Sequence, residues 1–278
     1  VLKGTSTELL SPKKLADDFA KTWGYLRDQV TDLKAREGGK WDHDQWYAFG
    51  RNQNMNQMDT PKLVVQVLAK SPRFAFDGQG FYFTGGGNGP YYGVRWLAPD
   101  APSSLHFLQA LMNSPVTDFF IRKTSTTFHG DYWSYGKRFI EKVPVCTLNL
   151  TNSAERGQHD AIVRLVEWLL WLHRQPTVAE STREHPRDPL IAAYFAQWVN
   201  ALVYELYFPE AIHAAGLRFF DLTADHCLPP VNEWPKEDER LIKIRERFES
   251  LYEQNHRLRA SLFSLGSLEL ARTIENRD

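Results

Sequence analysis

The sequence is poor in the residues that form disulfides and metal sites. It has 2 cysteines among 278 residues. Cys146 and Cys227 lie neither in a CxxC pair nor at a Cys/His spacing that is typical of zinc sites. The sequence therefore excludes a disulfide framework and a cysteine-based metal site. Two reduced thiols in a cytoplasmic protein are expected.

Long hydrophobic runs are also missing. The most apolar stretch, residues 162–172, contains Arg164 and Glu167 and is too short to span a bilayer. No signal peptide is recognisable, and the first residue is Val1 rather than Met, which suggests a fragment of a longer protein. We expect a soluble, cytoplasmic chain that does not bind a membrane.

Motifs for common catalytic sites are absent. The sequence has no G-x-S-x-G, no Walker loop, no H-E-x-x-H and no Asp- or Asn-Pro-Pro-aromatic motif. The segment Leu228-Pro229-Pro230-Val231 has two prolines, but its flanking residues differ from that last motif. We therefore predict no catalytic residue and no metal ligand in this chain. A hidden hydrolase is disfavoured for the same reason.

One glycine-rich stretch has the pattern F-x-G-x-G, at residues 83–87. In methyltransferases this pattern forms a cofactor loop, which requires a strand before it and a helix after it. Here Asn88-Gly89-Pro90 and a tyrosine-rich stretch follow, so no helix begins. We interpret the stretch as a flexible hairpin loop and predict that this chain binds no cofactor.

A strong excess of one charge is missing, since the net charge is −1. The distribution is nevertheless uneven. Residues 40–150 carry 11 Lys and Arg against 8 Asp and Glu, whereas residues 151–278 carry 15 against 20. This asymmetry is too mild to identify a nucleic-acid-binding protein by itself.

The pattern of apolar residues predicts an α/β (α+β) protein, with a small mixed sheet followed by a helical region. Asp77-Gly78 is a hairpin turn signal between two phenylalanine-rich arms. Pro115 is expected to break the helical stretch 103–120. Further helices are predicted at 12–37, 162–171, 190–207 and 237–262, and strands within 62–68, 73–86 and 91–97. The predicted domains are a connector helix at 1–39, a sheet-containing domain at 40–150 and a helical region at 151–278.

An unusual amide-rich stretch lies between residues 52 and 57, where five of six residues are Asn or Gln. Arg, Asn and Gln make bidentate contacts with guanine and adenine edges in the major groove. The stretch therefore suggests base contacts from Arg51, Asn52, Gln53 and Asn54, with Lys62 holding a phosphate. A loop whose amides bond its own backbone is an equally good interpretation.

A second polar cluster occupies residues 121–139. Cations, hydroxyls and exposed aromatic rings together are what a surface uses to grip a sugar–phosphate backbone. The alternative without a binding role is a solvent-exposed basic loop whose aromatic residues lie in the core. The residues predicted to contact DNA here are Arg122, Lys123, Thr124, Ser125, Tyr132, Trp133, Lys137 and Arg138.

Four segments in this order resemble a known family: WYAFGRNQNM followed by TPKLVV, FAFDGQGFYFTGG, LHFLQALMNSPVTDFFIR, and FHGDYWSYGKRFIEKVPV. They look like the TaqI-like specificity domain, the target-recognition part of DNA adenine-N6 methyltransferases and of type IIG restriction–modification enzymes. The resemblance covers roughly residues 10–150. Residues 201–212 resemble a helix that commonly follows this domain, whereas 175–188 and 213–235 depart from the pattern.

The resemblance implies that this chain recognises double-stranded DNA for a methyltransferase domain that precedes it in the longer enzyme. That domain would bind S-adenosylmethionine and flip an adenine out of the stack. Arg122→Ala or Lys137→Ala should then weaken binding to all duplexes alike, whereas Arg51→Ala should relax sequence preference. Whether the longer enzyme also cleaves DNA is left open.

The helical region 151–278 suggests a different class of function. It is acidic and rich in aromatic residues, which fits a protein-interaction module for another subunit or for self-association. Exposed apolar surface on its helices would favour that hypothesis.

Overall fold

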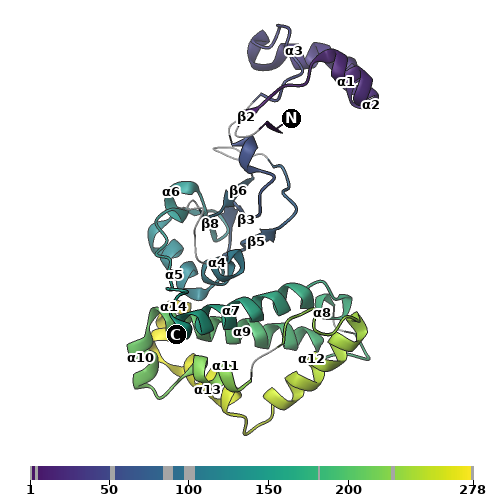
Figure 1. Ribbon diagram of the computed structural model, residues 1–278. Helices are drawn as coiled ribbons and strands as arrows, with labels where there is room; N and C mark the ends of the chain where they lie inside the picture. The colour runs from purple at the N-terminus through teal and green to yellow at the C-terminus, as the bar shows by residue number, and fades with distance from the viewer. Residues whose placement is uncertain are drawn as a thin grey trace. The chain divides into compact units, whose positions relative to one another are not determined.

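The computed structural model describes residues 2–3, 6–50, 54–83, 90–96, 104–180, 182–226 and 229–276. They form two compact units (Figure 1), one from Val1–Pro61 with Gly78–Phe83 and the other from Lys62–Asp77 with Thr84–Asp278. The fold is mixed α and β with a helical region, as predicted. The described strands form two three-stranded sheets and one two-stranded sheet, all antiparallel. The predicted domain boundaries at 39/40 and 150/151 stay predictions.

The first unit contains three short helices where one helix was predicted for residues 12–37. The backbone leaves the helical conformation at Phe19 (φ −137°, ψ 46°) and again at Gln29 (φ −100°, ψ 11°). The regular spacing of apolar residues indicates which residues lie on one face of a helix. That spacing can continue across a short break in the helix, so it does not reveal the break. The prediction of one continuous helix was therefore wrong. The helices are α1 (Pro12–Asp18), α2 (Ala20–Asp28) and α3 (Val30–Gly39).

The two ends of this helical segment agree with the sequence signals. The Ser11 side chain accepts a hydrogen bond from the Lys14 backbone N–H at 3.2 Å, and Pro12 is the first helical residue. At the other end Gly38 and Gly39 have φ of +72° and +87°, a left-handed conformation that glycine adopts without strain. The remaining elements of this unit are β1 (Leu2–Lys3), β2 (Ser6–Thr7) and the 3₁₀ helix η1 (Met55–Gln57).

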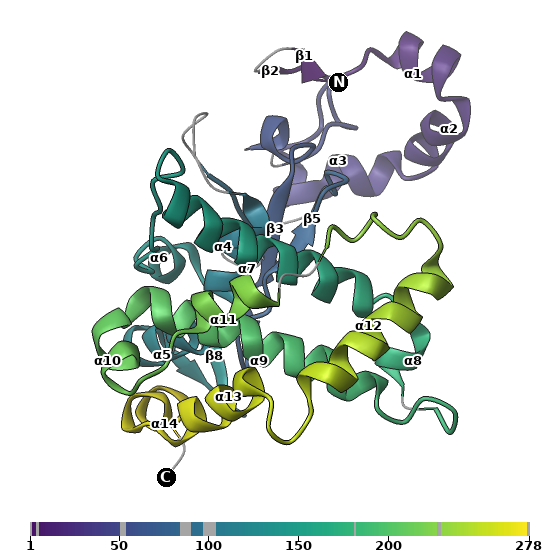
Figure 2. The ribbon, with the colours of Figure 1, turned by 60° about the horizontal axis from the view of Figure 1, so that its bottom comes forward.

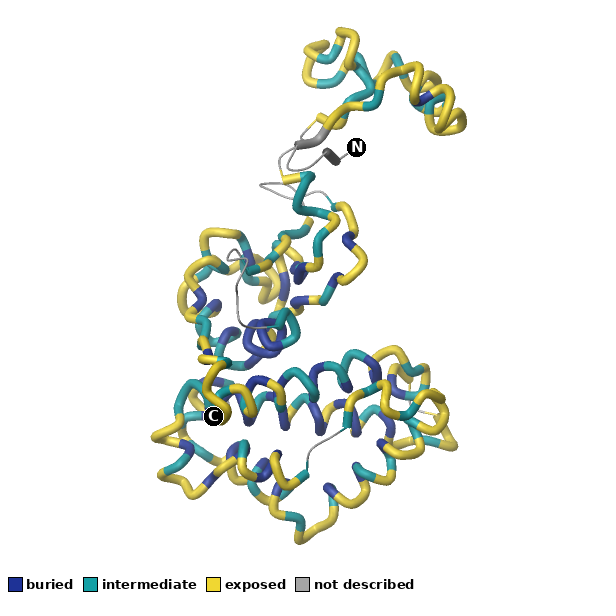
Figure 3. The backbone as a smooth tube through the Cα atoms, in the orientation of Figure 1, coloured by how far each residue is buried: buried dark blue, intermediate teal, exposed yellow. Residues whose placement is uncertain are grey.

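The aromatic residues that precede the amide-rich stretch pack against other segments of the first unit. The ring of Trp23 lies 5.8 Å from Trp46 and 5.4 Å from Tyr47, centroid to centroid. Tyr47 donates its hydroxyl to the Leu10 carbonyl at 2.8 Å, and Arg36 donates to the Trp46 carbonyl at 2.6 Å. These contacts give Trp46 and Tyr47 a structural role. Most of the unit is nevertheless exposed (Figure 3).

The second unit begins with a segment that contributes to two sheets. Residues 62–66 form the middle strand of one sheet, and residues 68–69 form an edge strand of the other. The turn between them is held by Val67, which donates to the Pro90 carbonyl and accepts from the Tyr135 N–H. The first sheet has the order β5-β3-β6 and the second β4-β8-β7. Their strands are β3 (Lys62–Gln66), β4 (Leu68–Ala69), β5 (Ala75–Asp77), β6 (Tyr91–Val94), β7 (Thr127–Phe128) and β8 (Tyr132–Ser134).

The predicted hairpin at Asp77-Gly78 does not form. Strand β5 pairs with β3, with Asp77 opposite Lys62, and the described residues 78–83 form no strand and belong to the other unit. The reason lies in burial, because Leu63 and Val65 of β3 are 0% and 1% exposed. A strand this deeply buried takes partners on both edges, β5 and β6, and it takes them in preference to the local turn. The turn residues therefore did not decide the pairing.

The break predicted at Pro115 is confirmed, and the helix before it belongs to two cores. Helix α4 (Leu105–Met112) ends before Pro115, which is the first residue of α5 (Pro115–Thr124). Leu108 and Met112 of α4 pack into the core beneath the sheets, whereas Phe107 and Leu111 pack into the helical core. Figure 3 shows α4 as almost entirely buried. This helix therefore ties the sheet region to the helical region.

Two long helices form the centre of the helical region, and both were predicted. Helices α7 (Ser153–Leu172) and α9 (Asp188–Tyr207) lie side by side in Figures 1 and 2 and bury Trp168 and Trp198 completely. The helix predicted at 237–262 is instead two helices separated by residues 252–256. The others are α6 (Lys137–Ile140), α8 (Pro176–Ala179), α10 (Pro209–Ala214), α11 (Phe219–Asp225), α12 (Glu237–Leu251), α13 (Arg257–Ser267) and α14 (Glu269–Glu275). None of the described helices combines the length and apolar character that crossing a membrane requires.

A buried ion pair joins α9 to α12 and makes the stability depend on pH. Arg245 donates two hydrogen bonds to the Asp188 carboxylate, at 2.9 and 2.6 Å, and Asp188 is 2% exposed. Burial alone would raise the pKa of Asp188, but hydrogen bonds and attraction from Arg245 lower it overall. A carboxyl whose folded-state pKa is lowered stabilises the fold above its unfolded pKa of about 3.9. That contribution is lost as the pH falls through the lower folded-state pKa.

We expect Asp188→Asn to reduce the free energy of unfolding at pH 7 by about 1–3 kcal/mol, because a charged hydrogen-bond acceptor is lost. The difference from the wild type should shrink as the pH falls below about 4. Urea unfolding of both proteins between pH 3 and pH 7 measures this. A difference that stays constant over this range would contradict the assignment.

Candidate nucleic-acid interface

The sheet β4-β8-β7 presents an exposed outer face. Tyr132 of β8 lies directly opposite Phe128 of β7, and Ser134 lies opposite Leu68 of β4. Because side chains alternate across a strand, Tyr132 and Ser134 share one face, together with the residues opposite them. Leu68, Phe128 and Tyr132 are 40%, 48% and 40% exposed. We call this surface the outer face.

The opposite face of the same sheet is packed. Ala69 is buried, and Trp133 lies opposite it, half-buried against the core that contains Phe74 and Tyr135. Of the aromatic residues at 132, 133 and 135, only Tyr132 is therefore available to a ligand. Trp133, which the sequence suggested as a DNA contact, has a packing role in this structure.

Five exposed cations lie on the segments next to this sheet, and they differ in how they are held. Lys70, directly after β4, lies 5.4 Å from the ring centroid of Tyr132. Lys123 lies over the Phe119 ring at 5.3 Å, and Arg138 over the Phe139 ring at 4.5 Å. Such contacts hold a cation while leaving its charge uncompensated. We call the set the cationic rim; it comprises Lys70, Arg122, Lys123, Lys137 and Arg138.

Arg122 differs from the rest of the cationic rim because it is paired. Its Nε donates to the Asp118 carboxylate at 2.9 Å. Burial raises the pKa of Asp118, while the charge of Arg122 and a hydrogen bond from it lower that pKa. Arg122→Ala would remove the partner of a partly buried carboxylate, so it would change the fold as well as the surface. Lys137, which is exposed and begins α6, is the cleaner position for testing phosphate contacts.

The hydroxyls predicted to contact DNA are engaged with the protein. Thr124 donates to the Phe120 carbonyl at 2.8 Å, and Ser125 donates to the Ser134 carbonyl at 2.6 Å. The bond from Ser125 fixes the end of α5 against β8. A hydroxyl oxygen keeps acceptor capacity after donating, but a phosphate needs a donor. Both residues therefore position the interface rather than grip a backbone.

The other predicted cluster lies partly outside the described residues, which omit Arg51, Asn52 and Gln53. Asn54 is exposed, has a φ of +61° and accepts a hydrogen bond from the Gln57 side chain at 3.5 Å. It belongs to the first unit, whereas the outer face belongs to the second. Base contacts by these four residues remain a prediction.

The phosphate contact expected from Lys62 does not fit the structure. Its ammonium lies 2.6 Å from the Asp77 carboxylate, and Lys62 is 3% exposed. A buried ammonium that already has a carboxylate partner cannot reach a phosphate without leaving the core. The sequence missed this because Lys62 and Asp77 face each other only once β3 and β5 have paired.

Sequence analysis also missed Lys70, Phe128 and the exposure of Leu68. Lys70 could have been predicted from the alternation of side chains along a strand, because residues 68 and 70 point to the same side if the strand continues. The signal for Phe128 is its position opposite Tyr132 across the short loop 129–131. Both require strand limits that the sequence alone did not supply.

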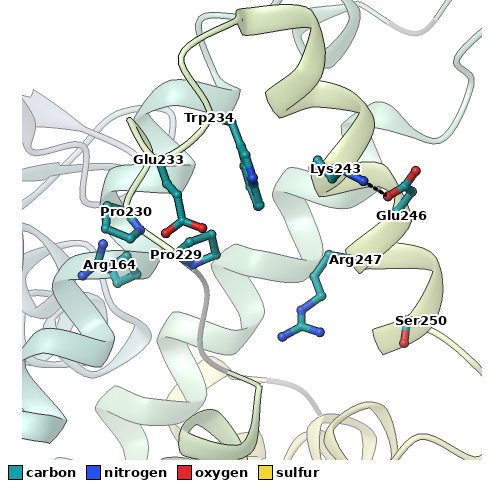
Figure 4. Close-up of a pocket in the computed structure, with 9 residues that line it drawn as sticks. All are labelled: Arg164, Pro229, Pro230, Glu233, Trp234, Lys243, Glu246, Arg247 and Ser250. Carbon is teal, nitrogen blue, oxygen red and sulfur yellow. Dashed lines mark hydrogen bonds and ion pairs between the residues drawn. The ribbon is translucent and has the colours of Figure 1, made fainter.

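The helical region has a surface cavity of about 630 Å³ between α7, residues 229–234 and α12 (Figure 4). Its charges are mixed: Arg164, Glu233 and Arg247 all line it, and Lys243 pairs with Glu246 at 3.0 Å. The mixture gives it no preference for an anionic backbone. In the part of the chain that the structure describes, no group of His, Cys, Asp and Glu is arranged to hold a metal ion.

Comparison with known proteins finds relatives among restriction and modification enzymes. The chain is 22% identical over 152 residues to the type II restriction enzyme and methyltransferase RM.Eco57I of Escherichia coli. It is 23% identical over 155 residues to the type II methyltransferase M.BstVI of Geobacillus stearothermophilus. The chain has homologues among type II restriction and modification enzymes.

The extent of these matches limits what they establish. They cover 54% and 55% of this chain but only 15% of the E. coli protein and 26% of the G. stearothermophilus protein. The chain thus spans a small part of the length of either relative. No family model matches the sequence. The relatives connect the chain to restriction–modification systems.

Proposed function

We propose that the sheet region of this chain recognises double-stranded DNA for an adenine-N6 methyltransferase of a type II restriction–modification system. One observation carries the proposal: the outer face exposes two aromatic rings, with Lys70 5.4 Å from the ring centroid of Tyr132, and the segments next to this sheet expose Lys123 and Lys137, and none of the three lysines has a carboxylate partner in the described residues. Uncompensated cations around an exposed, relatively flat sheet form the electrostatic footprint of a DNA-binding surface. The relatives support the coarser part of the proposal, a role in a restriction–modification system.

The division of labour within the proposed interface follows from side-chain chemistry. The cationic rim would hold phosphates and release condensed counterions, which gives affinity without sequence preference. Groups that reach into a groove would supply specificity. The catalytic step would be carried out by residues outside this chain, where S-adenosylmethionine binds and the target adenine is flipped out of the duplex. The residues that decide whether that enzyme also cleaves DNA would likewise lie outside this chain.

The first test is fluorescence anisotropy of the chain with a randomised duplex at about 50 mM and about 200 mM salt. A protein that neutralises several phosphates loses on the order of 100-fold or more in affinity over this range. We therefore expect clear binding at low salt that weakens steeply. Absence of binding at 50 mM salt, or affinity that is independent of salt, would contradict the proposal.

Self-association through residues 151–278 is weakly supported by the structure. Leu190, Ile242 and Phe263 are 39%, 52% and 64% exposed, but they lie on three different helices, α9, α12 and α13. Scattered exposure of single apolar residues is common in monomeric proteins. Measuring the mass of the chain by chromatography with light scattering, without DNA, tests the hypothesis, which requires an oligomer.

A further inference from the structure

The loop between β7 and β8 carries an exposed carboxylate in the same sheet region as the cationic rim. Residues His129, Gly130 and Asp131 connect Phe128 to Tyr132, which face each other across the two strands. All three loop residues are exposed. The loop is therefore the tip of a two-stranded ribbon, and a ribbon of this kind fits the major groove of B-DNA.

Asp131 lies in a tight turn and carries an exposed charge. Its φ is +63°, in the left-handed region that Asp and Asn tolerate in turns, and the preceding Gly130 has a φ of +79°. In addition, the described residues provide no ion-pair partner for its carboxylate, although Lys70 and Arg138 belong to the same small sheet region. The turn thus leaves an exposed carboxylate that has no ion-pair partner among the described residues.

A carboxylate at this point works against phosphate binding, because it repels a polyanion. It becomes favourable only opposite a hydrogen-bond donor on the DNA. In the major groove the donors are the N4 amino group of cytosine and the N6 amino group of adenine. Cations along the rim and one acceptor at the tip match this arrangement, with phosphates at the groove edges and a base between them.

We propose that Asp131 is a specificity-determining residue that accepts a hydrogen bond from the amino group of a cytosine or adenine in the major groove. This inference rests on the proposed DNA-binding function of the outer face. It adds a base contact that is independent of the amide-rich stretch at 52–57. The inference also predicts that the negative charge of Asp131 lowers the affinity of the protein for DNA of any sequence.

The test is a selection of bound sequences from a randomised duplex pool with the wild type, Asp131→Asn and Asp131→Ala, followed by anisotropy on the selected and random duplexes. For Asp131→Ala we expect the preference at one base pair to disappear, with a loss on the order of 10-fold in the ratio of selected to random affinity. Affinity for the random pool should be unchanged or rise several-fold, because a repulsive charge is gone.

The matched control is Glu141→Gln, which removes one exposed negative charge directly after α6, outside the loop 129–131. It should leave the selected sequence unchanged. If the wild type and Asp131→Ala select the same sequence with the same ratio, the inference is overturned while DNA binding stands. If the wild type does not bind the pool at about 50 mM salt, the proposed function itself fails.

Discussion

Replacing Lys70, Lys123 and Lys137 together by alanine is expected to weaken binding to any DNA duplex on the order of 100-fold at low salt. Each lysine is exposed, and none has a carboxylate partner in the described residues, so the change removes charge without leaving a carboxylate uncompensated. If all three contact phosphates, the slope of log affinity against log salt should fall by about three. Anisotropy across a salt series measures both quantities.

The matched control removes three exposed cations from the helical region, with Arg183→Ala, Lys236→Ala and Arg257→Ala. It changes the net charge of the protein by the same amount. If DNA binds at the cationic rim, the control should keep most of its affinity and nearly all of its salt slope. Equal losses in the two triple variants would show that only net charge matters, which would rule out a localised interface.

Asp77→Ala is expected to destabilise the second unit by about 3–5 kcal/mol, because it leaves the Lys62 ammonium buried without its carboxylate partner. This is a large share of the total stability of an ordinary domain. Chemical unfolding followed by tryptophan fluorescence measures the effect. The result would also confirm that Lys62 supports the fold, in contrast to the phosphate contact suggested by the sequence.

Two further variants test whether Asp77→Ala destabilises the fold through the unpaired buried charge or through a general loss of contacts. In the double variant Lys62→Met with Asp77→Leu no charge is left in the core, so much of the lost stability should return. Glu246→Ala breaks the exposed pair with Lys243 and should unfold close to the wild-type midpoint. If the double variant were as unstable as Asp77→Ala, packing rather than charge would explain the effect.

Local signals in the sequence predicted two helix starts well, but they predicted the continuity of helices and the partners of strands poorly. Ser11 and Pro12 at one helix start, and Pro115 at another, act on the backbone within one turn, so the outcome depends little on the rest of the chain. The Asp77-Gly78 turn failed because pairing in a sheet depends on which strands can bury β3 from both edges. That competition involves residues far apart in the sequence.

In the candidate interface, too, some features follow from local sequence signals and others depend on tertiary contacts. The sequence by itself determined the fold class, the main helices and the concentration of cations and aromatic residues within 121–139, because composition and periodicity are local properties. Only the tertiary structure decided that Lys62 is buried against Asp77, that Trp133 faces the core, and that Lys70 joins Phe128 and Tyr132 on one surface. The physical reason is strand register: a shift of one residue moves every side chain to the opposite face, and tertiary pairing fixes that register.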